Sequence, residues 1–180
     1  MSNAELSGLQ QEALAIAGAL DDAGIEHALI GGLAVLLHGS ERVTFDIDFL
    51  LRNECREAFV ALLRTRGYES MHEAVSFGNY VIPGRRRVDA LYARTDAGRG
   101  MLARARVSEL AGDRIRVAAP EDLIGLKLQA VHNDPRRFRD WGDIRVLLAL
   151  RDGNLDMLRV REYFAIFGFH EQLEQLLAKP

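Results

Sequence analysis

The spacing of apolar residues predicts alternating helices and strands over the first two thirds of the chain. Apolar residues three and four apart favour a helix over Glu5–Ala23, which Gly24 ends. Short apolar runs bounded by turn residues favour strands instead. These runs cover His27–Ile30, Val43–Leu51, Phe77–Ile82, Arg86–Ala93, Val107–Leu110 and Ile115–Ala118. The third and fourth of these strands are expected to pair as a hairpin around Pro83-Gly84.

The last third of the chain has helical spacing alone. Pro120 suits the first turn of a helix that extends to about His132. Further helices are expected to about Leu150 and over residues 155–167 and 170–178. The pattern therefore predicts an α+β fold, with a β-sheet flanked by helices over residues 1–118 and a C-terminal helical subdomain over residues 119–180.

Composition narrows the class of protein. Hydrophobic residues make up 48% of the chain and charged residues 27%, which is typical of globular proteins. No apolar run approaches the roughly 18 residues that a membrane span needs. The single cysteine, Cys55, excludes an internal disulfide and a cysteine-based metal site. A cytoplasmic protein without a membrane partner is the simplest expectation.

Charge is distributed unevenly. Residues 1–81 contain 5 basic and 12 acidic residues, whereas residues 82–139 contain 13 basic and 7 acidic residues. The basic middle segment either attracts phosphates or nucleic acid, or forms a solvated arginine-rich face. Lys127 is one of only two lysines among the 23 basic residues. It lies mid-helix, where either a required compact charge or a simple helix former would fit.

Two carboxylates interrupt the apolar strand Val43–Leu51. Asp46 and Asp48 are two residues apart, so in a strand their side chains project from the same face. Buried carboxylates need a positive partner, and a pair of divalent cations about 3.5–4 Å apart would provide one. Asp89 completes a three-carboxylate cluster if its strand pairs with the strand Val43–Leu51. Such oxygen ligands favour Mg²⁺ or Mn²⁺. The alternative is an edge strand whose carboxylates face solvent.

Gly31-Gly32 follows the first predicted strand and precedes a short helix. Two glycines at the start of a helix expose backbone N–H groups and let a phosphate approach closely. A tight turn alone would also explain them. An anion site beside metal-binding carboxylates is what a nucleoside triphosphate requires.

These residues together resemble the signature of the nucleotidyltransferase superfamily related to DNA polymerase β. Ile30-Gly31-Gly32 matches its hydrophobic and small residues, and 13 residues later Asp46-Ile47-Asp48-Phe49 matches its alternating acids. Asp89 matches the third acid of the superfamily. The segment from Arg42 to Asp48 is most similar to bacterial AbiEii-type proteins, which are toxins of toxin–antitoxin pairs. Lys127 and the later stretch Arg137-Phe138-Arg139-Asp140 resemble their second motif more loosely.

The resemblance implies a mixed sheet and a metal-dependent transfer of a nucleoside monophosphate from an NTP to an acceptor. It implies that Asp46, Asp48 and Asp89 are catalytic and bind Mg²⁺ or Mn²⁺. It also implies that the nucleotide contacts Gly31, Gly32, Arg42 and Lys127. The acceptor is open among a tRNA, a protein and a small molecule, and an antitoxin protein is a possible partner.

Two further readings complete the sequence-based expectations. A non-catalytic nucleotide-binding or partner-binding module with the same fold is the alternative function. Asp140 and Asp143 are three residues apart on one predicted helix, and a solvated helix face is the favoured interpretation.

Overall fold

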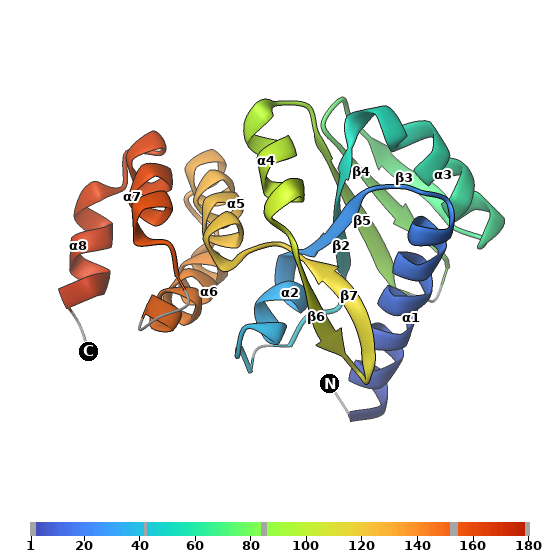
Figure 1. Ribbon diagram of the computed structural model, residues 1–180, viewed down its shortest axis with the longest axis horizontal. Coiled ribbons are helices and arrows are strands. Elements are labelled where there is room, and N and C mark those ends of the chain that lie inside the picture. Colours follow the sequence, from blue (N-terminus) through green and yellow to red (C-terminus); the bar gives the residue numbers. More distant parts are fainter. Residues whose placement is uncertain (1–2, 42, 84–85, 152–154, 179–180) are drawn as a thin grey trace. The chain divides into compact units, whose positions relative to one another are not determined.

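The computed structural model describes residues 3–41, 43–83, 86–151 and 155–178. Its backbone divides into two compact units. The first comprises residues 1–37 and 41–118, and the second comprises residues 38–40 and 119–180. A seven-stranded sheet lies in the first unit and a set of helices in the second (Figure 1). The predicted fold class, a mixed sheet with flanking helices and a following helical part, is confirmed. The assignment of separate roles to the two parts stays a prediction.

The sheet is mixed because two of its six strand pairs are parallel. The strand order is β3-β4-β5-β2-β1-β7-β6, in which β2 pairs parallel to β5 and β1 parallel to β7. The other four pairs are antiparallel, and they include the predicted hairpin of β4 and β5. The strands are β1 (His27–Ile30), β2 (Ile47–Arg52), β3 (Glu69–Glu73), β4 (Phe77–Val81), β5 (Arg87–Ala93), β6 (Arg106–Leu110) and β7 (Asp113–Val117).

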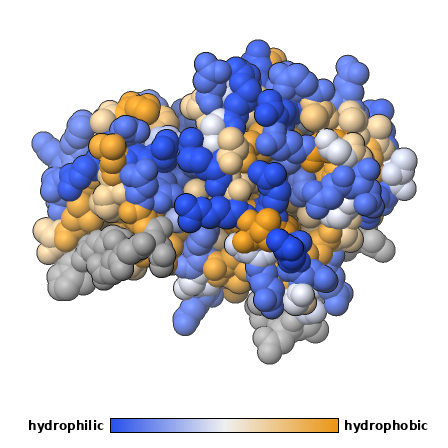
Figure 2. Space-filling view, viewed as in Figure 1, coloured by the Kyte–Doolittle hydropathy of each residue, from blue (hydrophilic) through white to orange (hydrophobic). Residues whose placement is uncertain are grey.

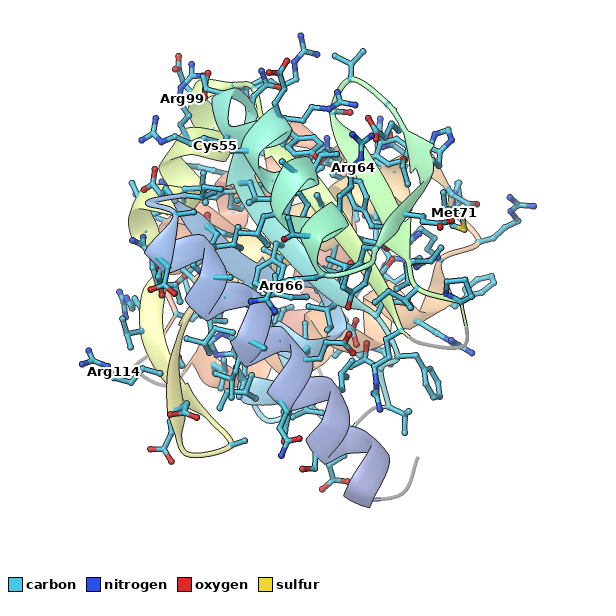
Figure 3. All side chains as sticks on the ribbon, turned by 90° about the vertical axis from the view of Figure 1, so that its right-hand side faces the viewer. Cys55, Arg64, Arg66, Met71, Arg99 and Arg114 are labelled. Atoms are coloured by element: carbon cyan, nitrogen blue, oxygen red, sulfur yellow. The ribbon has the colours of Figure 1, made fainter. Side chains whose placement is uncertain are left out.

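Helices flank this sheet. Figure 1 shows α1 (Asn3–Asp22) and α3 (Arg56–Thr65) side by side on one side of it, and α4 (Asp96–Arg104) on the other. The short α2 (Gly31–Leu37) directly follows β1, and a 3₁₀ turn (Asn53–Cys55) precedes α3. Figure 3 looks onto α1 and α3 and labels Arg64 and Arg66, whose side chains are exposed. Both arginines lie at the C-terminal end of α3, where a cation complements the helix dipole.

The core between the sheet and these helices consists of alternate strand residues. Ile47, Phe49 and Leu51 of β2 are completely or almost completely buried. Phe59 of α3 packs edge-on against Tyr80 of β4, with ring centroids 5.6 Å apart. Because strand side chains alternate between faces, Asp48 and Asp89 project from the opposite face of the sheet to Phe49.

The second unit contains α5 (Pro120–Asn133), α6 (Phe138–Leu148), a 3₁₀ turn (Ala149–Arg151), α7 (Met157–Ile166) and α8 (His170–Ala178). Polar contacts join α5 to α7. The Tyr163 hydroxyl donates to Asp122 at 2.7 Å, and the Asp156 backbone N–H donates to Glu121 at 2.6 Å. A Cβ on Gly125 would lie 2.9 Å from the Tyr163 ring, so glycine allows this close helix packing.

On the face shown in Figure 2, hydrophilic residues predominate and apolar residues occur in patches among them. No helix in the described part of the chain is long and apolar enough to cross a membrane.

Candidate active site

A row of residues crosses four neighbouring strands of the sheet. Asp48 on β2 is in register with Ile30 on β1 on one side and with Asp89 on β5 on the other. Asp89 is in turn in register with Asn79 on β4. Side chains in register on neighbouring strands share a face. The strand pairing therefore places two carboxylates and one carboxamide side by side.

The turn after β1 brings backbone against this row. Gly31 has φ +68°, a left-handed conformation that glycine adopts without steric cost. A Cβ built on Gly31 would lie only 2.0 Å from Asp48 Oδ2 and 2.3 Å from its Cγ. Two features therefore require glycine at this position. One is the left-handed backbone conformation, and the other is that the Asp48 carboxylate occupies the space of a Cβ.

The Arg87 side chain connects Asp46 to Asp89. Its Nη2 donates to Asp46 Oδ2 at 2.8 Å, and its Nε lies 3.0 Å from Asp89 Oδ1. Arg87 and Asp89 are two residues apart on β5, so their side chains lie on the same face of the sheet. The guanidinium therefore bridges Asp46 and Asp89 and neutralises part of the negative charge of the three carboxylates.

Burial, a hydrogen bond and nearby charges all act on the Asp89 carboxyl. Burial raises the pKa of the Asp89 carboxyl above its usual value. The hydrogen bond from Asn79 Nδ2, 2.8 Å long, and the charge of Arg87 act in the opposite direction, while repulsion from Asp46 adds to the increase in this pKa. A carboxyl with a raised pKa beside other acids is typical of functional sites and also occurs in structural ion-pair networks.

One expectation about these acids is wrong. The sequence predicted a strand over Val43–Leu51, but β2 begins at Ile47, so Asp46 lies just before the strand. The reason is that pairing begins only there, because β2 first pairs with β5 at Ile47 and with β1 at Asp48. The ion pair with Arg87 nevertheless keeps the Asp46 carboxylate beside the row.

The predicted nucleotide-binding residues have different placements. Gly31 and Gly32 form the first turn of α2, and Gly31 lies against Asp48. Arg42 lies outside the residues that the structure describes. Lys127 lies on α5, in the second unit. Their roles in binding a nucleotide stay predictions.

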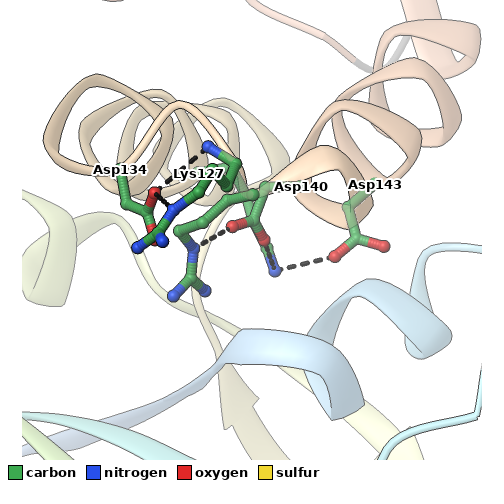
Figure 4. Close-up of polar contacts among 6 residues, drawn as sticks. Lys127, Asp134, Asp140 and Asp143 are labelled. Atoms are coloured by element: carbon green, nitrogen blue, oxygen red, sulfur yellow. Dashed lines mark hydrogen bonds and ion pairs between the residues drawn. The ribbon is translucent and has the colours of Figure 1, made fainter.

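Lys127 is the centre of a buried ionic cluster within the second unit (Figure 4). Its Nζ lies 2.8 Å from Asp140 Oδ1 and 2.7 Å from Asp143 Oδ2, and Arg137 also pairs with Asp140. Burial acts to raise the pKa of Asp140, but Lys127 and Arg137 outweigh it and hold this pKa below its usual value. The interpretation of Asp140 and Asp143 as solvated residues is therefore wrong, because both are almost completely buried.

Sequence reasoning missed two residues that contact Asp89. The first, Asn79, is identified only by the hairpin register of β4 and β5. The second, Arg87, belongs to an arginine-rich stretch that was interpreted by its charge alone. Its spacing of two residues from Asp89 was an available signal, because such spacing places both side chains on one face of a strand.

The chemistry of the donor set suits a hard divalent cation. Asp46, Asp48 and Asp89 provide only oxygen ligands, as Mg²⁺ and Mn²⁺ prefer, and two of them already converge on one positive group, the Arg87 guanidinium. In the conformation described, however, no three His, Cys, Asp or Glu side chains among the described residues are close enough together to hold a metal ion. The carboxylates fit a metal by their chemistry, but to hold one they would have to close in on it, with the Arg87 side chain moved from between Asp46 and Asp89.

Solved structures with the same fold are nucleotidyltransferases or resemble them. The antibiotic-resistance factor ANT(2″)-Ia aligns with a TM-score of 0.68 and 19% identity, over 97% of this chain and 97% of that one. An antigenic nucleotidyltransferase-like protein from Paracoccidioides brasiliensis aligns at 0.62 and 19%, over 98% and 94%. The lincosamide antibiotic adenylyltransferase LnuA aligns at 0.56 and 16%, over 82% and 96%. No curated protein matches the chain in sequence.

These alignments define the fold as that of a nucleotidyltransferase. The family model described as "Nucleotidyl transferase AbiEii toxin, Type IV TA system" matches residues 15–179. The chain therefore belongs to the AbiEii nucleotidyl transferase family, in agreement with the resemblance seen in its sequence.

Proposed function

We propose that this protein is a metal-dependent nucleotidyltransferase that moves a nucleoside monophosphate from an NTP to an acceptor hydroxyl. The observation that carries this proposal is the registered pair Asp48 and Asp89, with Asp46 held beside them and Gly31 packed against Asp48. An edge strand with solvent-facing acids would not explain this arrangement, because β2 and β5 are central strands of the sheet.

The proposed roles follow the positions of the residues. Asp46 and Asp48 hold the cation that accompanies the triphosphate, and Asp89 completes the site on the acceptor side. Cations held there would supply positive charge to offset the negative charge that develops at the α-phosphorus and on the leaving pyrophosphate. Gly31 and Gly32 lie in the first turn of α2, where backbone N–H groups lack partners within the helix and suit phosphate oxygens.

The transfer balances as a simple substitution at phosphorus. The acceptor oxygen bonds to the α-phosphorus, the bond from that phosphorus to the α–β bridging oxygen breaks, and pyrophosphate leaves. The Asp89 carboxylate takes the proton of the acceptor hydroxyl and passes it to water. The products are a phosphodiester between the nucleoside monophosphate and the acceptor, and pyrophosphate.

The acceptor is to be chosen by experiment from classes that the related proteins suggest. ANT(2″)-Ia has been crystallised with adenylyl-2″-tobramycin, and LnuA with lincomycin bound. Both are antibiotic-sized molecules, so small hydroxyl compounds belong in the assay beside tRNA and protein. Several arginines of the basic segment are already in ion pairs within the chain. They are Arg87, Arg99, Arg136 and Arg137. This pairing favours a small acceptor over a nucleic acid.

The test is transfer of label from α-³²P NTPs in the presence of Mg²⁺ or Mn²⁺, with each acceptor class offered. We expect Asp48→Asn and Asp89→Asn to reduce transfer by about 100-fold or more, because each removes a charged ligand at the reacting phosphate. Asp96→Asn is the matched control, since Asp96 is an exposed acid on α4 that pairs only with Arg99 in a described contact. Wild-type transfer by both site variants would refute the metal assignment. Nucleotide binding without transfer to any acceptor would support the non-catalytic module.

We further propose that the activity arrests growth and that an antitoxin protein counteracts it, as the description of the family suggests. Induced expression of the wild-type chain is expected to stop growth, whereas the Asp48→Asn variant is not. Co-expression of the adjacent reading frame should restore growth. Equal growth arrest by both chains would contradict a toxic role for the transfer reaction.

A further inference from the structure

We propose that Arg87 is a positioning residue that acts as an internal counter-cation for the carboxylates. It holds Asp46 and Asp89 in place, lowers their affinity for free divalent cations, and yields its position when a cation arrives with a triphosphate. This inference rests on the proposed function. It makes Arg87 the residue that favours a cation bound to a triphosphate over a free cation.

The contacts of Arg87 are those of a bridging cation. One guanidinium nitrogen lies 2.8 Å from Asp46 Oδ2 and another lies 3.0 Å from Asp89 Oδ1. Asp89 Oδ1 also accepts a 2.8 Å hydrogen bond from Asn79. Asp89 Oδ1 is therefore already engaged by one hydrogen bond and one ion pair, and a metal that binds this oxygen must compete with both.

The bridge is built so that the side chain of Arg87 can move while the strand stays fixed. The backbone of Arg87 begins β5, which pairs with β4 at Val81 and continues beside β2. The side chain is 39% exposed and Asp46 is 40% exposed, whereas Asp89 is only 19% exposed. Because one end of the bridge is open to solvent, the guanidinium can leave without any rearrangement of the sheet.

The charge of Arg87 should make the site bind a cation that carries a triphosphate more readily than a free cation. The three acids outnumber the one guanidinium, which stays protonated at any ordinary pH. A free divalent cation must displace a positive group and leave it without its partners. A cation bound to a triphosphate brings anionic oxygens, and a guanidinium pairs well with phosphate oxygens. Arg87 can thus exchange carboxylates for phosphate, and metal and nucleotide should each tighten the binding of the other.

The experiment measures Mn²⁺ binding directly, by the electron paramagnetic resonance signal of free Mn²⁺, on the full chain. Arg87→Gln removes the charge and keeps a donor of similar reach, and Arg87→Lys keeps the charge but loses the planar fork. Arg99→Gln is the matched control, because Arg99 is another arginine of the first unit that forms an ion pair, in its case with Asp96 on α4. Each protein is titrated alone and with α,β-methylene ATP, which cannot be cleaved at the α-phosphorus, and the Mn²⁺ that this nucleotide binds without protein is subtracted.

We expect Arg87→Gln to bind Mn²⁺ alone about tenfold or more tightly than wild type, since a nearby charge shifts such equilibria by roughly one to three decades. Arg87→Lys and Arg99→Gln should bind Mn²⁺ like wild type. The factor by which α,β-methylene ATP tightens Mn²⁺ binding should be smaller in Arg87→Gln than in wild type. Circular dichroism spectra of the variants show whether each is folded.

The outcomes separate this inference from the proposed function. Equal Mn²⁺ affinity of wild type and Arg87→Gln, with binding that depends on Asp89, overturns the role of Arg87 and leaves the metal site intact. Equal tightening by Arg87→Lys also overturns it, because charge would then not be the cause. Absence of Mn²⁺ binding by wild type and Arg87→Gln, even with α,β-methylene ATP, overturns the metal assignment and the inference together.

Discussion

Replacing Gly31 by alanine tests the geometry on which the site depends. The new Cβ would lie 2.0 Å from Asp48 Oδ2, whereas ordinary contacts begin near 3.4 Å. The carboxylate must therefore withdraw by roughly 1 Å or more, and a displacement of that size at a catalytic group typically costs about 100-fold in rate. The left-handed backbone adds about 1 kcal/mol of strain, and a displaced Asp48 side chain adds roughly another 1 kcal/mol.

Gly24→Ala separates these two effects. Gly24 has φ +65°, almost the same as Gly31, but a Cβ there meets nothing within 4 Å. We expect urea denaturation to show a loss of about 1 kcal/mol for Gly24→Ala and about 2 kcal/mol for Gly31→Ala. Label transfer should be unchanged in Gly24→Ala and about 100-fold slower in Gly31→Ala. If the two variants have equal stability and equal label transfer, the close approach of Gly31 and Asp48 does not affect activity.

Two further predictions concern buried ionisable groups. Lys127→Met leaves Asp140 and Asp143 buried without the ammonium group that they share. The free energy of unfolding measured in urea should therefore fall by about 3 kcal/mol. An unchanged urea midpoint would show that the ionic cluster does not stabilise the fold. Burial lowers the pKa of His27 below 6.5, although its Nδ1 bonds to the Ile25 carbonyl. The unfolded chain then binds a proton that the folded chain does not, so wild-type stability should be full above about pH 6.5 and fall as the pH drops towards 5. His27→Gln should flatten this fall in urea titrations at pH 7.5 and 5, and an equal fall in both proteins would refute the assignment.

Local rules predicted the elements well where one residue type decides the backbone. Pro120 begins α5 as expected, and β1 has the predicted bounds, because a proline at a first turn and glycine after an apolar run leave few alternatives. The predicted start of β2 was wrong because strand ends depend on the partner strands, and β2 first pairs with β5 at Ile47 and with β1 at Asp48.

The candidate site was predicted in part. Asp48 and Asp89 were expected to meet only if their strands paired, and the structure shows that β2 and β5 do so in parallel. Nothing in the spacing of residues 48 and 89 requires that register, since α3, β3 and β4 intervene. The burial of Asp140 and Asp143 was also beyond local rules, because it depends on the reach of Lys127 from another helix.

The parallel pairing of β2 with β5 has a consequence for how the protein is made. The two strands are adjacent in the sheet, but residues 53–86 separate them along the chain. Closing such a long connection lowers the entropy of the chain before any strand contacts offset that loss. Contacts of this kind therefore form slowly and late in folding. A nascent chain therefore holds Gly31 and Asp48 together early, yet lacks Asn79, Arg87 and Asp89 until β5 has left the ribosome. Because β5 ends at Ala93, the carboxylate row is complete only after more than half of the 180 residues have been synthesised.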